Sequence, residues 1–194
     1  LRGYQAEIQA GDLELNEIIG LIEKSERPVL YVGGGIITGG ASEELLKLAE
    51  SCNIPVTTTL MGIGGFPEEH PLSLRWLGMH GAAFANWAVN GEYVQRKSPS
   101  EPLVQLKEGA DLLIACGVRF DDRVTNTPSK FCPDAKIIHI DIDPTSISKT
   151  VSAHIPITGP VDNVLTEMVA QIEEQQRAGT RPDAEALAEW WGQI

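Results

Sequence analysis

Short blocks of apolar residues alternate along this chain with stretches in which apolar positions recur every three or four residues. The continuous blocks predict buried strands over residues 28–32, 54–60, 111–116, 136–142 and 155–158. The helical spacing predicts helices over residues 12–26, from 42 onward, over 81–89 and over 161–176. Strands that alternate with helices indicate an α/β fold with a doubly wound parallel sheet and helices on both faces.

Polar and turn-forming residues predict where these elements begin and how they connect. Asp12 and Ser42 are suitable N-caps for the first two helices. Residues 61–78, rich in glycine and proline, predict a long irregular segment, and residues 91–109 predict a surface insertion. We expect one domain over residues 1–176. Residues 177–194 would then be a linker and the start of a following domain. Leu1 in place of a methionine also predicts a domain excised from a longer chain.

The composition disfavours several classes of partner. The 194 residues suffice for one well-packed domain, and a formal net charge of −12 without a basic run disfavours nucleic acid and anionic membranes as partners. No apolar stretch is long enough for a transmembrane helix, and no signal-peptide pattern is present. The three separated cysteines predict reduced core thiols in a cytoplasmic protein, and the four histidines lack the spacing of a metal site.

The most informative polar cluster follows the third predicted strand. Gly117-Val118-Arg119-Phe120-Asp121-Asp122-Arg123 continues directly from the apolar block at 112–116. These charges could simply pair with one another, but exposed pairs contribute only about 0–1 kcal/mol. Guanidinium groups suit a pyrophosphate or a carboxylate, and open α/β sheets bind ligands at the carboxyl ends of their strands. We therefore expect a ligand site here.

A glycine run, Gly33-Gly34-Gly35, lies between a predicted strand and a predicted helix. Such a loop suits close approach to a phosphate, although a tight strand-to-helix turn explains it equally well. The dinucleotide fingerprint fails because Thr38 stands at its third glycine position and Thr57–Thr59 stand where an acid is expected. An NAD site of the usual Rossmann kind is therefore disfavoured.

Two further segments carry candidate ligand groups. Leu77-Gly78-Met79-His80-Gly81 places a histidine in a glycine-flanked loop, although His80 could be a surface residue and Met79 a core residue. Asp141 and Asp143 share one side of the fourth predicted strand, where a carboxylate commonly accepts hydrogen bonds from ribose hydroxyls. Asp141 is favoured for that role, and Asp143 is favoured as the cap of a turn.

Five segments in order carry a resemblance to a known family. They are Pro28–Gly35, Thr59–Gly62, Leu77–Gly81, Gly117–Arg123 and His139–Asp143, within a likeness that runs from Arg2 to about Ile172. Together they resemble the central domain of the large, catalytic subunit of acetolactate (acetohydroxyacid) synthase. Each motif is modest alone, but five in this order are specific.

The resemblance implies a thiamine-diphosphate enzyme of branched-chain amino-acid biosynthesis. Such an enzyme joins two pyruvates, or pyruvate and 2-oxobutanoate, with loss of CO2. Two of its three domains hold thiamine diphosphate and Mg2+ at a dimer interface, and the central one binds FAD on a six-stranded parallel sheet. The flavin is structural rather than a redox reagent. The implied partners are further catalytic subunits, as a homodimer or tetramer, and a small regulatory subunit.

The same resemblance implies roles for individual residues. Asp122 and Arg123 would face the substrate channel in which herbicides bind, and no residue of this domain would be catalytic. FAD would be held by Arg2, Gly33, Gly34, Gly35, Thr59, Leu60, Met61, Leu77, Gly78, Met79, His80, Gly117, Val118, Arg119, Phe120, Asp121, Asp141, Ile142 and Gly159.

Three departures from the family pattern and one absence qualify this expectation. Gly159-Pro160 stands where the family usually has Gly-Asp, residues 91–109 lengthen a connection, and the entry segment around Arg2 is shortened. The Gly-Asp-Gly motif followed by Asn-Asn, which holds thiamine diphosphate, is absent, so we expect no carboligase activity from this chain alone. The alternatives are the central domain of a pyruvate oxidase or of an ADP-binding oxalyl-CoA decarboxylase, and a non-catalytic nucleotide-binding module. An NAD-dependent enzyme of the deoxyhypusine-synthase or sirtuin kind is more remote.

Overall fold

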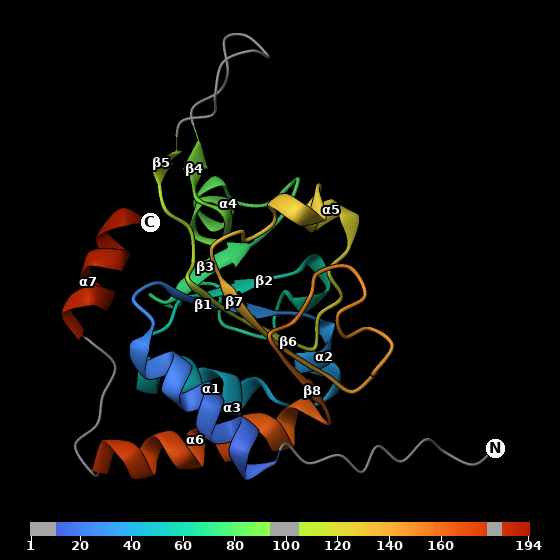
Figure 1. The fold of residues 1–194 in the computed structure, drawn as a ribbon, viewed down its shortest axis with the longest axis vertical. Coiled ribbons are helices and arrows are strands. Elements are labelled where there is room, and N and C mark those ends of the chain that lie inside the picture. Colours follow the sequence, from blue (N-terminus) through green and yellow to red (C-terminus); the bar gives the residue numbers. More distant parts are fainter. Residues whose placement is uncertain (1–10, 94–104, 178–183) are drawn as a thin grey trace, which may run out of the picture.

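A computed structural model describes residues 11–93, 105–177 and 184–194. Its centre is a parallel sheet of six strands in the order β3-β2-β1-β6-β7-β8. The expected doubly wound α/β fold is therefore confirmed, and Figure 1 shows the sheet between two layers of helices. The strands are β1 (Pro28–Val32), β2 (Val56–Thr58), β3 (Ser73–Trp76), β6 (Leu112–Cys116), β7 (Lys136–Asp141) and β8 (Ile155–Thr158).

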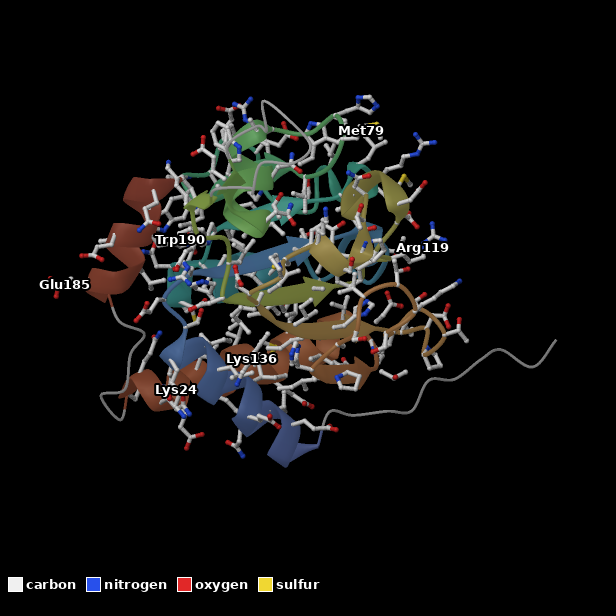
Figure 2. All side chains as sticks on the ribbon, turned by 45° about the horizontal axis from the view of Figure 1, so that its top comes forward. Lys24, Met79, Arg119, Lys136, Glu185 and Trp190 are labelled. Atoms are coloured by element: carbon white, nitrogen blue, oxygen red, sulfur yellow. The ribbon has the colours of Figure 1, made fainter. Side chains whose placement is uncertain are left out.

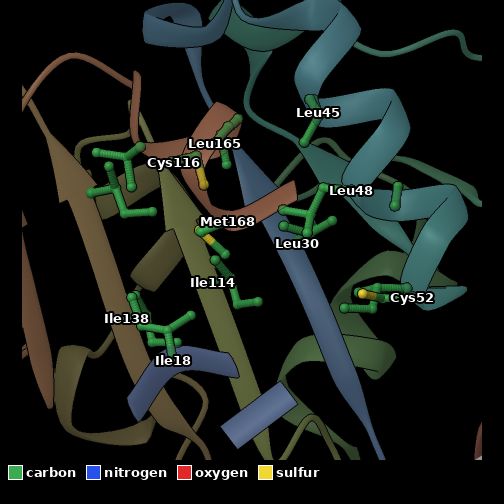
Figure 3. Close-up of a cluster of buried hydrophobic side chains, with 14 of the residues drawn as sticks. Ile18, Leu30, Leu45, Leu48, Cys52, Ile114, Cys116, Ile138, Leu165 and Met168 are labelled. Carbon is green, nitrogen blue, oxygen red and sulfur yellow. The ribbon is translucent and has the colours of Figure 1, made fainter. Parts of the chain in front are cut away.

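Three helices cover one face of the sheet: α1 (Asp12–Lys24), α3 (Ser42–Cys52) and α6 (Val161–Arg177). Successive residues of a strand point to opposite faces, so Leu30 and Val32 of β1 face this layer while Val29 and Tyr31 face the other. Figure 3 shows the resulting core, in which Ile18, Leu48 and Met168 from the helices meet Leu30, Ile114 and Ile138 from the strands.

The opposite face is covered by α4 (Ala83–Asn90), by α7 (Ala184–Gln193) and by the loop after β6, which contains the short α5 (Asp122–Thr125) and the 3-10 turn η2 (Pro128–Lys130). Trp190 of α7 is 1% exposed and belongs to this second core. Trp191 donates from its indole nitrogen to the Asn53 carbonyl at 3.4 Å. The last helix thus packs on the described domain. The boundary at residue 177 stays a prediction, since residues 178–183 lie outside the described residues.

The predicted N-caps are each wrong by one residue. The first backbone hydrogen bonds of α1 and α3 are accepted by Gly11 and Ala41, so Asp12 and Ser42 occupy the first helical positions. Helix α1 also ends at Lys24, before the predicted end at Glu26. The carboxylate of Asp111 explains the early end, because it accepts the Ser25 hydroxyl and the backbone N–H groups of Glu26 and Arg27.

The predicted strand 54–60 is shorter in the structure and is followed by another strand. Asn53 ends α3 in a left-handed conformation with φ 53°. After β2, the Thr59 hydroxyl accepts the Gly62 N–H at 3.0 Å and starts the 3-10 turn η1 (Leu60–Gly62). The segment predicted to be irregular contains β3, and the glycine run opens a five-residue helix, α2 (Gly34–Thr38). The predicted strand 136–142 ends one residue early, at Asp141.

The predicted insertion at residues 91–109 begins and ends in a two-stranded antiparallel hairpin, β4 (Glu92–Tyr93) and β5 (Gln105–Lys107). Its two ends touch, because a Cβ atom on Gly109 would lie 2.6 Å from the Gly91 nitrogen. Next to these two ends, the Arg27 guanidinium forms an ion pair with Glu108 at 3.0 Å. Within the described part of the chain, no helix combines the length and apolar character that crossing a membrane requires.

Candidate functional site

The strand order reverses between β1 and β6, and a cavity of about 500 Å3 opens there at the carboxyl ends of the strands. We call it the switch-point cavity. Open parallel sheets bind ligands at such a point, and the volume is within the range of small-molecule sites. Its lining residues are Gly33, Gly34, Gly35, Thr59, Leu60, Met61, Gly117, Val118, Arg119, Asp121, Arg123, Val124, Asp141, Asp143 and Ser146.

Three glycines allow two loops to cross at the base of this cavity. The Gly33 N–H donates to the Cys116 carbonyl and the Gly35 N–H donates to the Gly117 carbonyl, both at 3.1 Å. A Cβ atom on Gly33 would lie 2.3 Å from the Gly117 oxygen, which real side chains do not tolerate. Close backbone packing therefore explains Gly33 and Gly35, and the Gly35 N–H is already used within the protein.

The loop after β6 alternates between the core and the cavity. Val118 and Phe120 are 1% and 4% exposed, whereas the side chains of Arg119 and Asp121 are 75% and 59% exposed. Figure 2 shows Arg119 at the surface of this end of the molecule. The alternation buries the apolar members of the loop and leaves its charged members at the cavity.

The charges of this loop pair only loosely with each other. The guanidinium of Arg119 lies 3.7 Å from the Asp121 carboxylate, and that of Arg123 lies 3.9 Å from the Asp122 carboxylate. A charge-assisted hydrogen bond is about 2.7–2.9 Å long, and exposed pairs of this kind contribute little to stability. Both guanidinium groups can therefore accept an anionic ligand without breaking a strong contact.

Asp141, the last residue of β7, and Asp143, just after the strand, line the same cavity but differ in role. Asp143 accepts the N–H and hydroxyl of Thr145 at 2.9 and 2.8 Å and the hydroxyl of Ser146 at 3.2 Å, which confirms the predicted turn cap. These bonds, led by the Thr145 hydroxyl, lower the pKa of the Asp143 carboxyl. Asp141 is 9% exposed and accepts the Asp143 N–H through one oxygen at 2.8 Å. Asp141 keeps its second oxygen as an acceptor, because none of its contacts within the described ranges uses that atom.

The loop after β2 supplies apolar side chains to the cavity. Leu60 and Met61 are 62% and 75% exposed, which is high for large apolar residues. Both line the switch-point cavity. They give a potential ligand an apolar surface, whereas the loop after β6 gives it charged groups.

The segment Leu77–Gly81 meets the loop after β6 at a second, neighbouring cavity of about 450 Å3. Gly78 and Met79 line it, and the Met79 N–H donates to the Arg123 carbonyl at 2.9 Å. Arg123 and Val124 line both cavities. Met79 is 63% exposed, so its alternative interpretation as a core residue is wrong, whereas Leu77 is buried.

The structure brings most of the predicted ligand residues together but not all of them. Phe120 lies in the core and Ile142 is 52% exposed outside the cavity lining. Gly159 approaches only through its backbone, where its N–H donates to the Asp141 carbonyl at 3.0 Å. Arg2 lies outside the described residues. Other predicted residues that line neither cavity are Leu77, His80 and Asp122.

Among the residues that line the switch-point cavity, Val124 and Ser146 were not singled out from the sequence. Val124 lies in α5, just beyond the charged cluster, and Ser146 lies in the turn capped by Asp143. Both are in loops that leave the carboxyl ends of strands beside the strand-order reversal, so the topology rather than a motif would have identified them.

Two buried polar side chains, His139 and Tyr31, contact the loop after β6. His139 donates from Nε2 to the Val118 carbonyl at 2.9 Å, and its Nδ1 has no partner among the described residues. Burial lowers the pKa of His139, against the smaller opposing effects of that bond and of the Asp141 charge. The pKa of Tyr31 is raised by burial and, secondarily, by the negative charge of Asp121. Both side chains are therefore neutral near pH 7.

The described residues of this site include neither a metal-binding cluster nor an exposed thiol. In the described ranges, no three His, Cys, Asp or Glu side chains are placed to hold a metal ion. All three cysteines are buried, as predicted, and burial raises the pKa of Cys116, the last residue of β6, to about 12. The charged, carboxylate and apolar groups suit an extended ligand with an anionic centre and uncharged ends.

Comparison with known proteins shows a family and a set of relatives. The model of the thiamine pyrophosphate enzyme central domain matches residues 15–92 and 96–168. The chain is 42% identical over 194 residues to the acetolactate synthase large subunit of Buchnera aphidicola subsp. Schlechtendalia chinensis, covering 100% of this chain and 30% of the relative. It is 38% identical, with the same coverage, to the acetolactate synthase isozyme 3 large subunit of Escherichia coli K12.

An archaeal relative has higher identity over a shorter match. The probable acetolactate synthase large subunit of Methanocaldococcus jannaschii is 49% identical over 172 residues, which are 89% of this chain and 26% of that protein. The chain thus spans less than a third of the length of the relatives it matches.

Proposed function

Because the chain belongs to the family of thiamine pyrophosphate enzyme central domains, we propose that it is the FAD-binding domain of an acetolactate synthase large subunit. The main observation behind the proposal is that four separate segments of the chain meet at one cavity. The glycine run, the turn after β2, the charged loop after β6 and Asp141 are far apart in sequence, yet they line one cavity at the strand-order reversal. The relatives named acetolactate synthase give the proposal its enzyme.

The residues of the switch-point cavity fit a flavin dinucleotide in their chemistry. The Arg119 guanidinium, 75% exposed and only loosely paired, would bind the pyrophosphate. The free oxygen of Asp141 would accept ribose hydroxyls. Leu60 and Met61 would cover an aromatic ring system, and Gly78 and Met79 would extend that surface through the neighbouring cavity. Bound FAD would supply structural support rather than redox chemistry, as the family resemblance implies.

The same residues separate FAD from the alternative nucleotides. ADP offers a diphosphate, a ribose and adenine, but it has no second ring system that could cover Leu60 and Met61. NAD is disfavoured because the glycine run lacks its third glycine at Thr38 and the second strand leads into Thr59 rather than an acid. The apolar wall therefore favours FAD over ADP, and an ADP-binding decarboxylase remains the second candidate.

The carboligation itself would use groups outside this chain. The proposed enzyme joins two pyruvates, or pyruvate and 2-oxobutanoate, and requires thiamine diphosphate with Mg2+ held by its other domains. Arg123, which lines both cavities, and the exposed Asp122 next to it would face the substrate channel. We expect further catalytic subunits and a regulatory small subunit as partners, a cytoplasmic location, and no acetolactate from these 194 residues alone.

The nucleotide is tested by thermal unfolding of the chain in the presence of FAD, ADP or NAD. A ligand that binds only the folded state raises the unfolding temperature, and at equal concentration a tighter ligand raises it more. We expect FAD to raise it most, ADP less and NAD not at all. Equal shifts for ADP and FAD would favour the decarboxylase type, and no shift with either would overturn the nucleotide site.

The enzyme is tested in a chimera in which this chain replaces the matching 30% of the Escherichia coli isozyme 3 large subunit. We expect the folded chimera to retain bound FAD and to form acetolactate from pyruvate. The unmodified E. coli subunit is the positive control. A chimera that holds FAD but forms no acetolactate would contradict the assignment to this enzyme.

A further inference from the structure

His139 is a polar residue in a place that packing alone would fill with an apolar one. It lies on β7 opposite Ala115 of β6, which in turn lies opposite Tyr31 of β1, and all three face the second core. Its ring is fully buried and its Nδ1 has no partner within the described ranges. A buried ring nitrogen without a partner is unfavourable, so we expect a compensating contact at the other ring nitrogen, Nε2.

That other nitrogen holds the loop that carries Arg119. A carbonyl oxygen can only accept, so Nε2 bears the proton and donates to the Val118 carbonyl at 2.9 Å. The edge of the same ring packs against Phe120, with 5.0 Å between ring centroids at 84°. His139 therefore contacts the residues on both sides of Arg119.

Fixing these two neighbours fixes the direction of Arg119. The Val118 carbonyl belongs to the peptide plane that precedes Arg119, so the histidine bond orients that plane. The plane that follows is held by the Asp121 N–H, which donates to the Arg119 carbonyl at 2.9 Å. With both planes fixed and the flanking side chains buried, the backbone directs the Arg119 side chain to the cavity that it lines.

We propose that His139 is a positioning residue for the nucleotide site: it holds the Val118–Phe120 arch so that the Arg119 guanidinium faces the bound pyrophosphate. His139 does not itself contact the ligand. The inference rests on the proposed function for the identity of the ligand, but the loop geometry that it explains is present in the protein alone.

The first test measures the loop without ligand. In His139→Leu, which removes the donor, hydrogen exchange at the Gly117, Asp121 and Val124 amides should accelerate about tenfold or more relative to amides elsewhere in the sheet. His139→Gln restores an amide donor near the Nε2 position and should restore slow exchange. Ile138→Ala, on the same strand but in the opposite core, should destabilise the protein without selective exchange in this loop. Unchanged loop exchange in His139→Leu would overturn the inference whether or not any nucleotide binds.

The second test asks whether His139 acts through Arg119. In the otherwise unaltered chain, His139→Leu should weaken FAD binding about tenfold, with recovery in His139→Gln. In an Arg119→Ala background, the same change should weaken binding less than about twofold, because the group it positions is already gone. Equal losses in both backgrounds would overturn the positioning role. Failure of the unaltered chain to bind FAD would contradict the proposed function instead.

Discussion

A Cβ atom placed on Gly35 would lie 2.5 Å from the Cα atom of Gly117, so the loops after β1 and β6 are in backbone contact at the base of the switch-point cavity. The contact is reinforced by the bond from the Gly35 N–H to the Gly117 carbonyl. Gly117 also has φ +58°, a conformation that L-residues with side chains adopt at a cost. The geometry of the cavity therefore depends on these two glycines.

We expect Gly35→Ala to lower the free energy of unfolding by about 1–3 kcal/mol, the usual cost of forcing extra volume into a packed site. Denaturant unfolding measures this change. Gly20→Ala is the matched control, because Gly20 lies within α1 and an added Cβ would meet nothing within 4 Å. That control should raise the free energy of unfolding by about 0.5–1 kcal/mol through helix propensity. Equal effects at both positions would refute the tight crossing.

Arg119→Ala should weaken FAD binding about tenfold or more, because a hydrogen bond to a charged group contributes about 1.5–3 kcal/mol. Isothermal titration at two ionic strengths measures the change. High salt should reduce the difference between the variant and the unaltered chain. Arg177→Ala is the control, since its side chain is also 75% exposed but lies on α6 in an ion pair with Glu173. The role of Arg119 fails if both arginine variants bind FAD alike.

The Asp143 turn should make a pH-dependent contribution to stability. Its folded-state pKa is lowered, mainly by the Thr145 hydroxyl and N–H, so the unfolded chain takes up a proton first as pH falls. The contribution is full above the ordinary aspartate pKa and is lost as pH falls through the lower folded-state value. The difference in unfolding free energy between the unaltered chain and Asp143→Asn should therefore shrink on acidification. A difference that stays constant with pH would contradict the cap.

The three cysteines should be unreactive in the folded protein. Burial raises the pKa of the Cys52 and Cys116 thiols to about 12, and burial also raises that of Cys132, so thiolate is scarce at pH 8. A thiol-reactive chromogenic disulfide should modify all three only after unfolding in guanidinium. Rapid modification of any one in native buffer would show that the core opens there.

Hydrophobic spacing predicted most of the sheet, but local chain geometry limited it. Strand β3 escaped detection because it is short, follows a turn-rich segment and contains Arg75 at φ +58°, which interrupts the alternation of its side chains. The end of α1 was misplaced because a tertiary contact, to the Asp111 carboxylate, stops the helix. The end of β2 was misplaced because a local cap, the Thr59 hydroxyl on the Gly62 N–H, turns the chain after the strand.

Residues of the candidate site could be predicted where a sequence motif contains them. They could not be predicted where only the fold brings them to the cavity. Arg119, Asp121 and Asp141 could be identified because their charges stand at or just after the ends of buried strands. Ser146 could not, since its approach to the cavity depends on the Asp143 turn. His139 could not be predicted either, because Val118, which accepts its hydrogen bond, is 21 residues away in sequence.

The most direct test of the central claim is to map where FAD protects the chain. Hydrogen exchange with and without FAD measures the protection of each segment. We expect protection at residues 33–35, 59–61, 117–124 and 141–146, around the switch-point cavity, with little change in α1 or in the described strands of the β4–β5 hairpin. Protection by FAD of a surface away from both cavities, or none in these four segments at saturating FAD, would contradict the proposed site.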